Sequence, residues 1–186
     1  MEKALVLASG SPRRKELLSQ LSYPFTILVT DVEESRQPNE GPTEYVTRLS
    51  LDKARAALVE KPESIVIGSD TIVVCDQQVL EKPQDLAHAK QMLMMLSGRE
   101  HQVMTAVSVI TANKQETVVV STDVWFKTLS ENEVEQYWQS GEPCDKAGSY
   151  GIQGIGGRFV TRIEGSYHAV VGLPLFETDQ LLQKFL

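Results

Sequence analysis

Cysteine, histidine and long apolar runs are all scarce in this 186-residue chain. Its two cysteines, Cys75 and Cys144, are too few for a disulfide framework and lack C-x-x-C spacing, so we expect both to be reduced and structural. The three histidines lie far apart and form no metal-binding pair, which argues against a zinc centre. No stretch approaches the roughly 20 apolar residues of a membrane span, and the first residues lack the pattern of a signal peptide. These absences predict a cytoplasmic protein without a membrane partner.

Positive charge is also in deficit. The formal net charge of −7 argues against a protein that binds the backbone of long nucleic acids, because such binding depends on a basic face. A small anion remains a possible ligand, since it needs only a local cluster of cations. The hydrophobic fraction of 41% and the charged fraction of 23% are ordinary for a globular protein. The length predicts a single domain over residues 1–186, or one domain with a small lobe.

A cation-rich turn near the N-terminus is the first feature with chemical meaning. The apolar run Ala4–Ala8 predicts a strand, and the leucine spacing beyond Pro12 predicts an amphipathic helix. Ser11 suits the N-cap of that helix and Pro12 its first position. Arg13 and Arg14 would then lie at the positive end of the helix dipole, which repels cations and therefore suggests an anionic partner. The alternative is a capped surface helix with two solvated arginines.

Helices and strands alternate irregularly along the rest of the chain. We expect strands at 25–29, 64–68, 71–75, 103–111, 117–126 and 159–163, and helices at 43–60, 85–96, from Ser130 onward and at 175–185. The runs at 103–111 and 117–126 predict a hairpin, and the glycine-rich stretch 148–157 predicts a loop. The mixture indicates an α/β fold, with helices flanking a mixed, twisted sheet.

Several side chains are of the types that phosphoanhydride hydrolysis needs. That reaction requires positive charge on the phosphates, usually a divalent cation, and a base that takes a proton from water. Lys53 lies on or beside the apolar face of its helix, where it either reaches water or points into a cleft. Asp70, at the break between two strands, is either such a base or a turn residue that caps backbone N–H groups. The remaining candidates are Arg13, Arg14, Lys82 and Lys146 as cations, and Glu33 or Glu34 as a carboxylate that could equally be a solvated loop residue.

Five ordered blocks of sequence stand out along the chain. They are Leu7-Ala8-Ser9-Gly10-Ser11-Pro12-Arg13-Arg14, Gly68-Ser69-Asp70-Thr71, Glu81-Lys82-Pro83, Asp145-Lys146-Ala147-Gly148-Ser149-Tyr150-Gly151-Ile152-Gln153-Gly154 and Val170-Val171-Gly172-Leu173-Pro174-Leu175. Together they resemble the signature of the Maf family of nucleoside triphosphate pyrophosphatases. The resemblance implies an ITPase-like (Maf/Ham) fold and a homodimer. It also implies cleavage of a nucleoside triphosphate to the monophosphate and pyrophosphate with a divalent metal, and oxygen ligands favour Mg²⁺ or Mn²⁺.

The resemblance also implies roles for individual residues. The proton acceptor falls on Asp70, which would receive a proton from water attacking the α-phosphate. Thr71 and Gln153 resemble the subgroup that acts on dTTP and UTP. The chemistry is consistent with this, since a Gln amide can accept from N3–H of uracil or thymine and donate to O4. A 7-methyl-GTP-type pyrophosphatase and a nucleotide-sensing regulator of septum formation are the alternatives. The implied positions are Arg13, Thr71 and Gln153 for substrate specificity, Ser9, Arg13, Arg14, Lys53, Lys82 and Lys146 for phosphate, and Glu33 and Asp70 for metal.

Overall fold

The chain divides into two compact units in a computed structural model that describes residues 3–186. Unit 1 contains the described residues up to Asp70, together with Thr105–Val120 and Gly172–Leu186. Unit 2 contains Thr71–Met104 and Ser121–Val171. The expectation of a single domain over residues 1–186 stays a prediction.

A mixed β-sheet forms the frame of the fold. Strand β1 pairs in parallel with both β2 and β3, whereas β4 is antiparallel to β3 and β7 is antiparallel to β6. The path through the sheet is β2-β1-β3-β5-β6-β7, and β4 joins at β3. The predicted α/β class with a mixed sheet is therefore confirmed. The strands within residues 3–186 are β1 (Leu5–Leu7), β2 (Phe25–Ile27), β3 (Ile65–Cys75), β4 (Gln78–Leu80), β5 (Glu100–Thr111), β6 (Lys114–Phe126) and β7 (Val160–Glu164).

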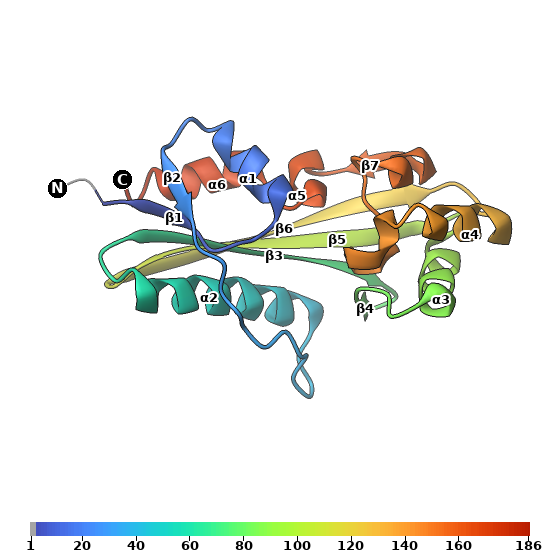
Figure 1. The fold of residues 1–186 in the computed structure, drawn as a ribbon, viewed down its shortest axis with the longest axis horizontal. Coiled ribbons are helices and arrows are strands. Elements are labelled where there is room, and N and C mark those ends of the chain that lie inside the picture. Colours follow the sequence, from blue (N-terminus) through green and yellow to red (C-terminus); the bar gives the residue numbers. More distant parts are fainter. Residues whose placement is uncertain (1–2) are drawn as a thin grey trace. The chain divides into compact units, whose positions relative to one another are not determined.

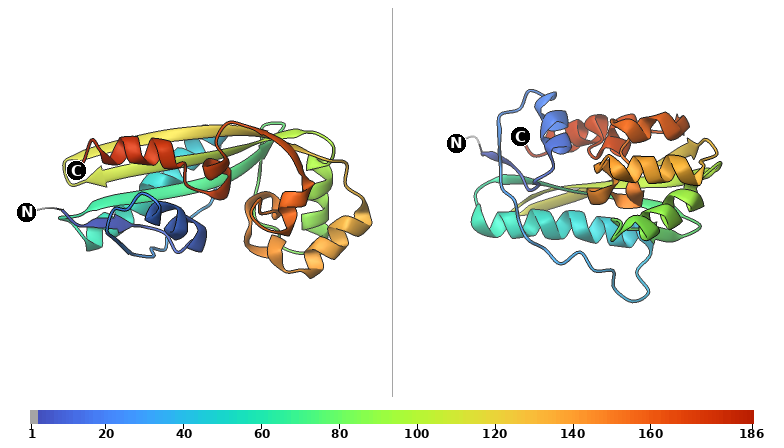
Figure 2. Two further views of the ribbon diagram at one scale, coloured as in Figure 1. Left: turned by 90° about the horizontal axis from the view of Figure 1, so that it is seen from above. Right: turned by 45° about the vertical axis from the view of Figure 1, so that its right-hand side comes forward.

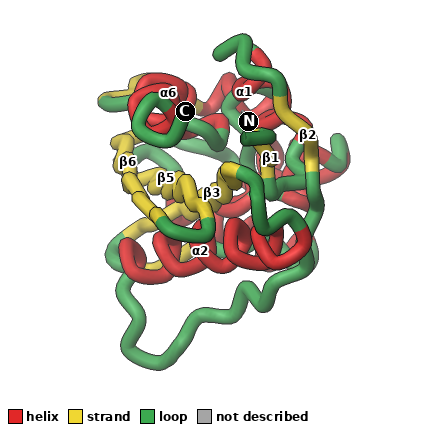
Figure 3. The backbone as a smooth tube through the Cα atoms, turned by 90° about the vertical axis from the view of Figure 1, so that its left-hand side faces the viewer, coloured by secondary structure: helices red, strands yellow, loops and turns green. Residues whose placement is uncertain are grey.

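Unit 1 is layered. Helix α2 (Pro42–Glu60) covers one face of its strands, and α1 (Pro12–Ser19) and α6 (Leu175–Leu182) cover the other (Figures 1 and 3). Ala54 and Ala57 of α2 pack in a buried cluster with Val66 and Ile110 of the sheet. Small residues on α2 let the helix lie close to the strands, so the polar side chains beside them can reach across.

Unit 2 is built on aromatic packing. Helices α3 (Leu86–Leu96) and α4 (Glu131–Gln139) lie side by side (Figure 2), and Lys90 pairs with Glu131 at 3.1 Å and Glu135 at 3.0 Å. The core holds a cluster of edge-to-face rings that includes Tyr137 and Phe159, whose centroids are 5.0 Å apart. The remaining elements are the 3₁₀ turns Glu142–Asp145, Ala147–Ser149 and Ile155–Phe159 and the short helix α5 (Tyr167–Val171). Within residues 3–186, no helix combines the length and apolar character that crossing a membrane requires.

The structure corrects one predicted break. The sequence suggests two β segments separated at Ser69 and Asp70, but β3 runs without interruption through both residues. The strand tolerates them because each buried polar side chain has a partner: Ser69 donates to the carbonyl of Gly172, and Asp70 accepts from Lys53.

The hairpin prediction for 103–126 is confirmed, since β5 and β6 are sheet neighbours joined by two residues. A second hairpin was not expected. After β3 the chain turns at Asp76 and Gln77, both with positive φ (50° and 64°), and the next residues form β4. Two consecutive residues with positive φ are what a two-residue hairpin turn of type I′ requires.

Candidate active site

The turn after β1 has the local structure that the sequence predicts. Ser11 is the N-cap of α1, and its hydroxyl accepts from the backbone N–H of Arg14 at 3.4 Å, with Pro12 in the first turn. The hydroxyl of Ser9, a buried residue, accepts from the N–H of Ser11 at 3.2 Å. Arg13 and Arg14 are both half-buried. The turn thus combines a helix N-terminus with two cations that are only partly exposed to water.

Arg14 is held by the last of the five sequence blocks. Its Nε donates to the carbonyl of Gly172 at 2.8 Å, and the hydroxyl of Ser69 donates to the same carbonyl at 3.1 Å. Gly172 has φ of 135°, a conformation that favours glycine. Burial lowers the pKa of Arg14, and attraction to the charge of Asp70 opposes that shift. A guanidinium stays protonated in proteins, so Arg14 is a fixed positive charge.

Lys53 meets two carboxylates. Its Nζ lies 2.7 Å from Oδ1 of Asp70 and 3.0 Å from Oε1 of Glu34. The alternative of a lysine that merely extends to water does not describe this side chain, which is 14% exposed. Asp70 is itself 7% exposed, so the pair is a largely desolvated charge contact.

Gly68 explains how Lys53 comes so near. A Cβ at this position would overlap the carbonyl oxygen of Ser50 and lie 2.8 Å from the backbone nitrogen of Ala54. Helix α2 can therefore rest on β3 only because residue 68 lacks a side chain. Since alternate residues of a strand face the same side, Asp70 faces α2 as Gly68 does, and Lys53, next to Ala54, reaches it.

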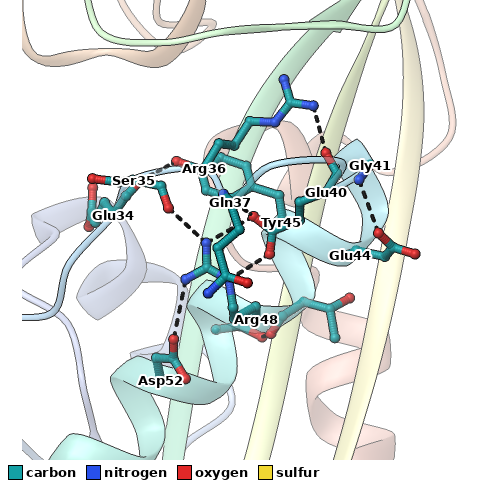
Figure 4. Close-up of polar contacts among 12 residues, drawn as sticks. Glu34, Ser35, Arg36, Gln37, Glu40, Gly41, Glu44, Tyr45, Arg48 and Asp52 are labelled. Atoms are coloured by element: carbon teal, nitrogen blue, oxygen red, sulfur yellow. Dashed lines mark hydrogen bonds and ion pairs between the residues drawn. The ribbon is translucent and has the colours of Figure 1, made fainter.

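The loop that carries Glu33 and Glu34 is tied to α2 by a polar network (Figure 4). Arg48 forms a two-pronged ion pair with Glu40, from Nε to Oε1 at 2.5 Å and from Nη2 to Oε2 at 2.9 Å. The same Nη2 donates to the carbonyl of Ser35 at 2.9 Å, and the hydroxyl of Tyr45 donates to the carbonyl of Glu34. The Arg48 hydrogen bond is the main reason why the pKa of Glu40 falls to about 2. This network holds the backbone from which Glu34 reaches Lys53.

The structure thus brings Glu34, rather than the adjacent Glu33, to Lys53 and Asp70. Both side chains are exposed, and the role of Glu33 as a metal ligand stays a prediction. Residues 3–186 contain no cluster of three or more His, Cys, Asp or Glu side chains arranged to hold a metal ion. However, Mg²⁺ is commonly bound by one or two carboxylates, retained waters and substrate phosphates. The oxygens of Asp70 and Glu34 are of the type that such a cation takes, with water and a bound phosphate as its other ligands.

Four predicted site residues belong to unit 2, namely Thr71, Lys82, Lys146 and Gln153. Lys82 is exposed and follows Glu81, whose carbonyl accepts from the N–H of Gly148 at 3.2 Å. The third and fourth sequence blocks therefore contact each other. Lys146 is 17% exposed, and its Nζ donates to the carbonyl of Glu142 at 3.1 Å and pairs with the Asp145 carboxylate at 2.9 Å. Its ammonium lies against its own loop.

The other two specificity positions differ in exposure. Thr71 is half-buried in β3, directly after Asp70, and Gln153 is exposed in the loop between the second and third 3₁₀ turns. The sequence did not predict the groups that hold the candidate site residues in place. These groups are the Gly172 carbonyl, the Arg48–Glu40 pair and the Tyr137–Glu142 pair. Only Gly172 carried a signal, because it lies inside one of the five blocks.

Unit 1 thus holds a candidate site for phosphate chemistry in an α/β protein. The site combines a permanently charged arginine, a helix N-terminus and a buried lysine–carboxylate pair. The family model described as Maf-like protein matches residues 4–185, and the chain belongs to the Maf family. A dTTP/UTP pyrophosphatase of Vibrio parahaemolyticus is 70% identical over 184 residues, which cover 98% of this chain and 97% of the relative. A dTTP/UTP pyrophosphatase of Vibrio cholerae is 70% identical over 182 residues, which cover 97% of each chain. The solved Ham1 protein of Staphylococcus aureus is more distant, at 15% identity and a TM-score of 0.46 over 67% of this chain and 72% of that one.

Proposed function

We propose that this protein hydrolyses dTTP and UTP to the corresponding monophosphate and pyrophosphate. The observation that carries the proposal is the end-to-end match to relatives named dTTP/UTP pyrophosphatase, 70% identical over nearly the whole chain. The buried Lys53–Asp70 pair and the fixed Arg14 support it, because they supply a candidate base and a candidate phosphate ligand. Removal of unwanted pyrimidine nucleotides from the cellular pool is a role consistent with such an activity.

In the proposed reaction, water attacks the α-phosphorus. A new oxygen–phosphorus bond forms while the bond from the α-phosphorus to the bridging oxygen breaks, and pyrophosphate leaves. Asp70 accepts the proton of the attacking water, and Lys53 at 2.7 Å holds the carboxylate in a fixed orientation. A divalent cation, Mg²⁺ or Mn²⁺, would be held by Asp70 with Glu33 or Glu34 and would neutralise phosphate charge.

The other proposed roles follow the family resemblance. In unit 1, Ser9, Arg13 and Arg14 contact phosphate through the turn after β1, where backbone N–H groups and the helix dipole favour an anion. In unit 2, Lys82 and Lys146 are proposed phosphate ligands. Arg13, Thr71 and Gln153 select the nucleotide, and the Gln153 amide accepts from N3–H and donates to O4 of uracil or thymine. Cytosine presents the reverse pattern at these atoms and is disfavoured. A homodimer and a cytoplasmic location remain predictions.

A panel of nucleotides tests the proposal directly. Purified protein is mixed with dTTP, UTP, CTP, GTP or 7-methyl-GTP and Mg²⁺ or Mn²⁺, and pyrophosphate release is measured. We expect fastest release from dTTP and UTP, and a loss of about 10²-fold or more for Asp70→Asn, the scale of a general base. Asp76→Asn is the matched control, because Asp76 is an exposed carboxylate paired with Arg99. Nucleotide binding without any pyrophosphate release would overturn the enzymatic proposal and favour the sensor.

A further inference from the structure

The loop that carries Gln153 is closed by two side chains that no sequence block contains. At one end, the N–H of Gly151 donates to the hydroxyl of Tyr137 at 3.2 Å. At the other end, the N–H groups of Ile155 and Gly156 donate to the two carboxylate oxygens of Glu142 at 2.8 and 2.9 Å. The Tyr137 hydroxyl in turn donates to Glu142. One tyrosine–glutamate pair therefore joins both ends of a six-residue loop.

Burial, ring packing and hydrogen bonds hold the Tyr137–Glu142 pair in place. Tyr137 lies on α4 and is 1% exposed, and its ring packs edge-to-face on Phe159 at a centroid distance of 5.0 Å. Burial raises the pKa of Tyr137, and the hydrogen bond to Glu142 adds to the shift, so the hydroxyl keeps its proton and donates. Burial alone would raise the pKa of Glu142, but the hydrogen bonds from Tyr137, Gly156 and Ile155 outweigh it and leave the pKa below its ordinary value. The contacts are thus charge-assisted, which strengthens each of them.

The glycines of the loop match this arrangement. A Cβ on Gly156 would lie 2.6 Å from the Tyr137 hydroxyl, and a Cβ on Gly154 would overlap the Glu142 carboxylate. The backbone therefore approaches the pair more closely than any residue with a side chain could. Gln153 is exposed between the two attached ends, so its amide is the polar group that this short loop presents.

We propose that Tyr137 and Glu142 are positioning residues that set nucleobase selection by fixing the loop of Gln153. The inference rests on the proposed function, in which the Gln153 amide reads the base. An amide tells uracil from cytosine only while its oxygen and nitrogen ends keep their places, because the two bases differ by an exchange of donor and acceptor. A loosened loop lets the amide turn over and accept cytosine. The pair therefore acts on discrimination and leaves the chemical step alone.

The test is Tyr137→Phe, which removes one hydroxyl and keeps the buried ring. We expect the ratio of kcat/KM for UTP to that for CTP to fall about tenfold, the scale of one or two lost hydrogen bonds. The loss should come from KM, with kcat for UTP unchanged. Tyr23→Phe is the matched control, because the Tyr23 hydroxyl also donates to a carboxylate, Oδ1 of Asp179 at 2.7 Å, within unit 1. Should Tyr137→Phe fail to fold, Glu142→Gln keeps the size of the side chain and removes one acceptor, and it is expected to lower the same ratio.

A third variant separates this inference from the base assignment. If Gln153→Ala lowers the UTP-to-CTP ratio while Tyr137→Phe behaves like Tyr23→Phe, the positioning role is overturned and the base assignment stands. If Gln153→Ala leaves the ratio unchanged, the base assignment fails and the inference fails with it. Measuring the dissociation constants of UTP and CTP by calorimetry keeps the ratio defined without turnover. Failure of the enzymatic proposal is then visible separately from failure of the positioning role.

Discussion

Replacing Gly68 with alanine should damage both the fold and the candidate site. The new Cβ would overlap the Ser50 carbonyl oxygen and lie 2.8 Å from the nitrogen and 2.9 Å from the Cβ of Ala54. The overlap with the Ser50 carbonyl oxygen is the shortest of these contacts. Atoms in ordinary contact are about 3.5–4.0 Å apart, so α2 must move away from β3 by roughly 1.5 Å. Overpacking of this kind costs about 1–3 kcal/mol of unfolding free energy.

The same movement of α2 would also disturb the candidate catalytic contact between Lys53 and Asp70. Lys53 adjoins Ala54, so its 2.7 Å contact with Asp70 lengthens when the helix retreats. A misplacement of about 1 Å in a catalytic group can cost about 10²-fold in rate. We therefore expect Gly68→Ala to lower kcat for UTP by one to two orders of magnitude, the lower end applying if Lys53 adjusts its rotamer.

Urea unfolding and pyrophosphate release measure the two effects separately. The matched control is Gly41→Ala on the same helix, where φ is −71° and the nearest atom to a new Cβ is Oε2 of Glu44 at 3.8 Å. Gly41 is the N-cap of α2, where alanine is less favourable than glycine, so this control should lose at most about 1 kcal/mol of unfolding free energy and keep its kcat. A Gly68→Ala protein with the parental midpoint and the parental kcat would refute the idea that close packing of α2 on β3 places Lys53.

Three other changes have defined outcomes. Burial lowers the pKa of His101 to about 4 from 6.5, so the unfolded chain binds a proton between these values that the folded chain does not. Neutral His101 therefore contributes fully to the free energy of unfolding above pH 6.5, and this contribution falls by up to about 3 kcal/mol as the pH drops toward 4. His101→Gln should flatten the pH dependence of the unfolding free energy, measured with urea from pH 4 to 7. Glu40→Gln should speed hydrogen exchange at Gln37, whose N–H donates to the Glu40 carboxylate at 3.0 Å, and Glu44→Gln serves as the control that should leave that amide unchanged. Ser69→Ala should cost less than about 1 kcal/mol in urea unfolding, because Arg14 still donates to the Gly172 carbonyl.

Local patterns were the predictable part of this molecule. The N-cap at Ser11 and the helix start at Ser130 depend on residues within one helical turn, and both are present. The helix period also placed Lys53 on or beside the inward face of α2. It could not name the partners of Lys53, because Asp70 lies on a strand 17 residues away and Glu34 lies in an irregular loop.

Other features depend on contacts that no local pattern encodes. Asp70 disfavours a strand by its intrinsic preference, but the pairing of β3 and the ammonium of Lys53 override that preference. Glu33 and Glu34 are adjacent and identical, and a loop has no period that shows which of them contacts Lys53. Tyr137 and Glu142 are close in sequence, but their hydrogen bonds to Gly151 and Gly156 are visible only in the folded structure.

The carbonyl of Gly172 also determines when the site can form. Its bonds to Arg14 and Ser69 span 158 and 103 residues of chain. Contacts of such long sequence separation form late in folding, because the intervening chain must be ordered first. During synthesis, Arg14 leaves the ribosome early but has no acceptor until residue 172 has emerged. A nascent chain therefore carries Arg14 without its carbonyl partner, and the turn after β1 gains its final contacts only after residue 172 has been made.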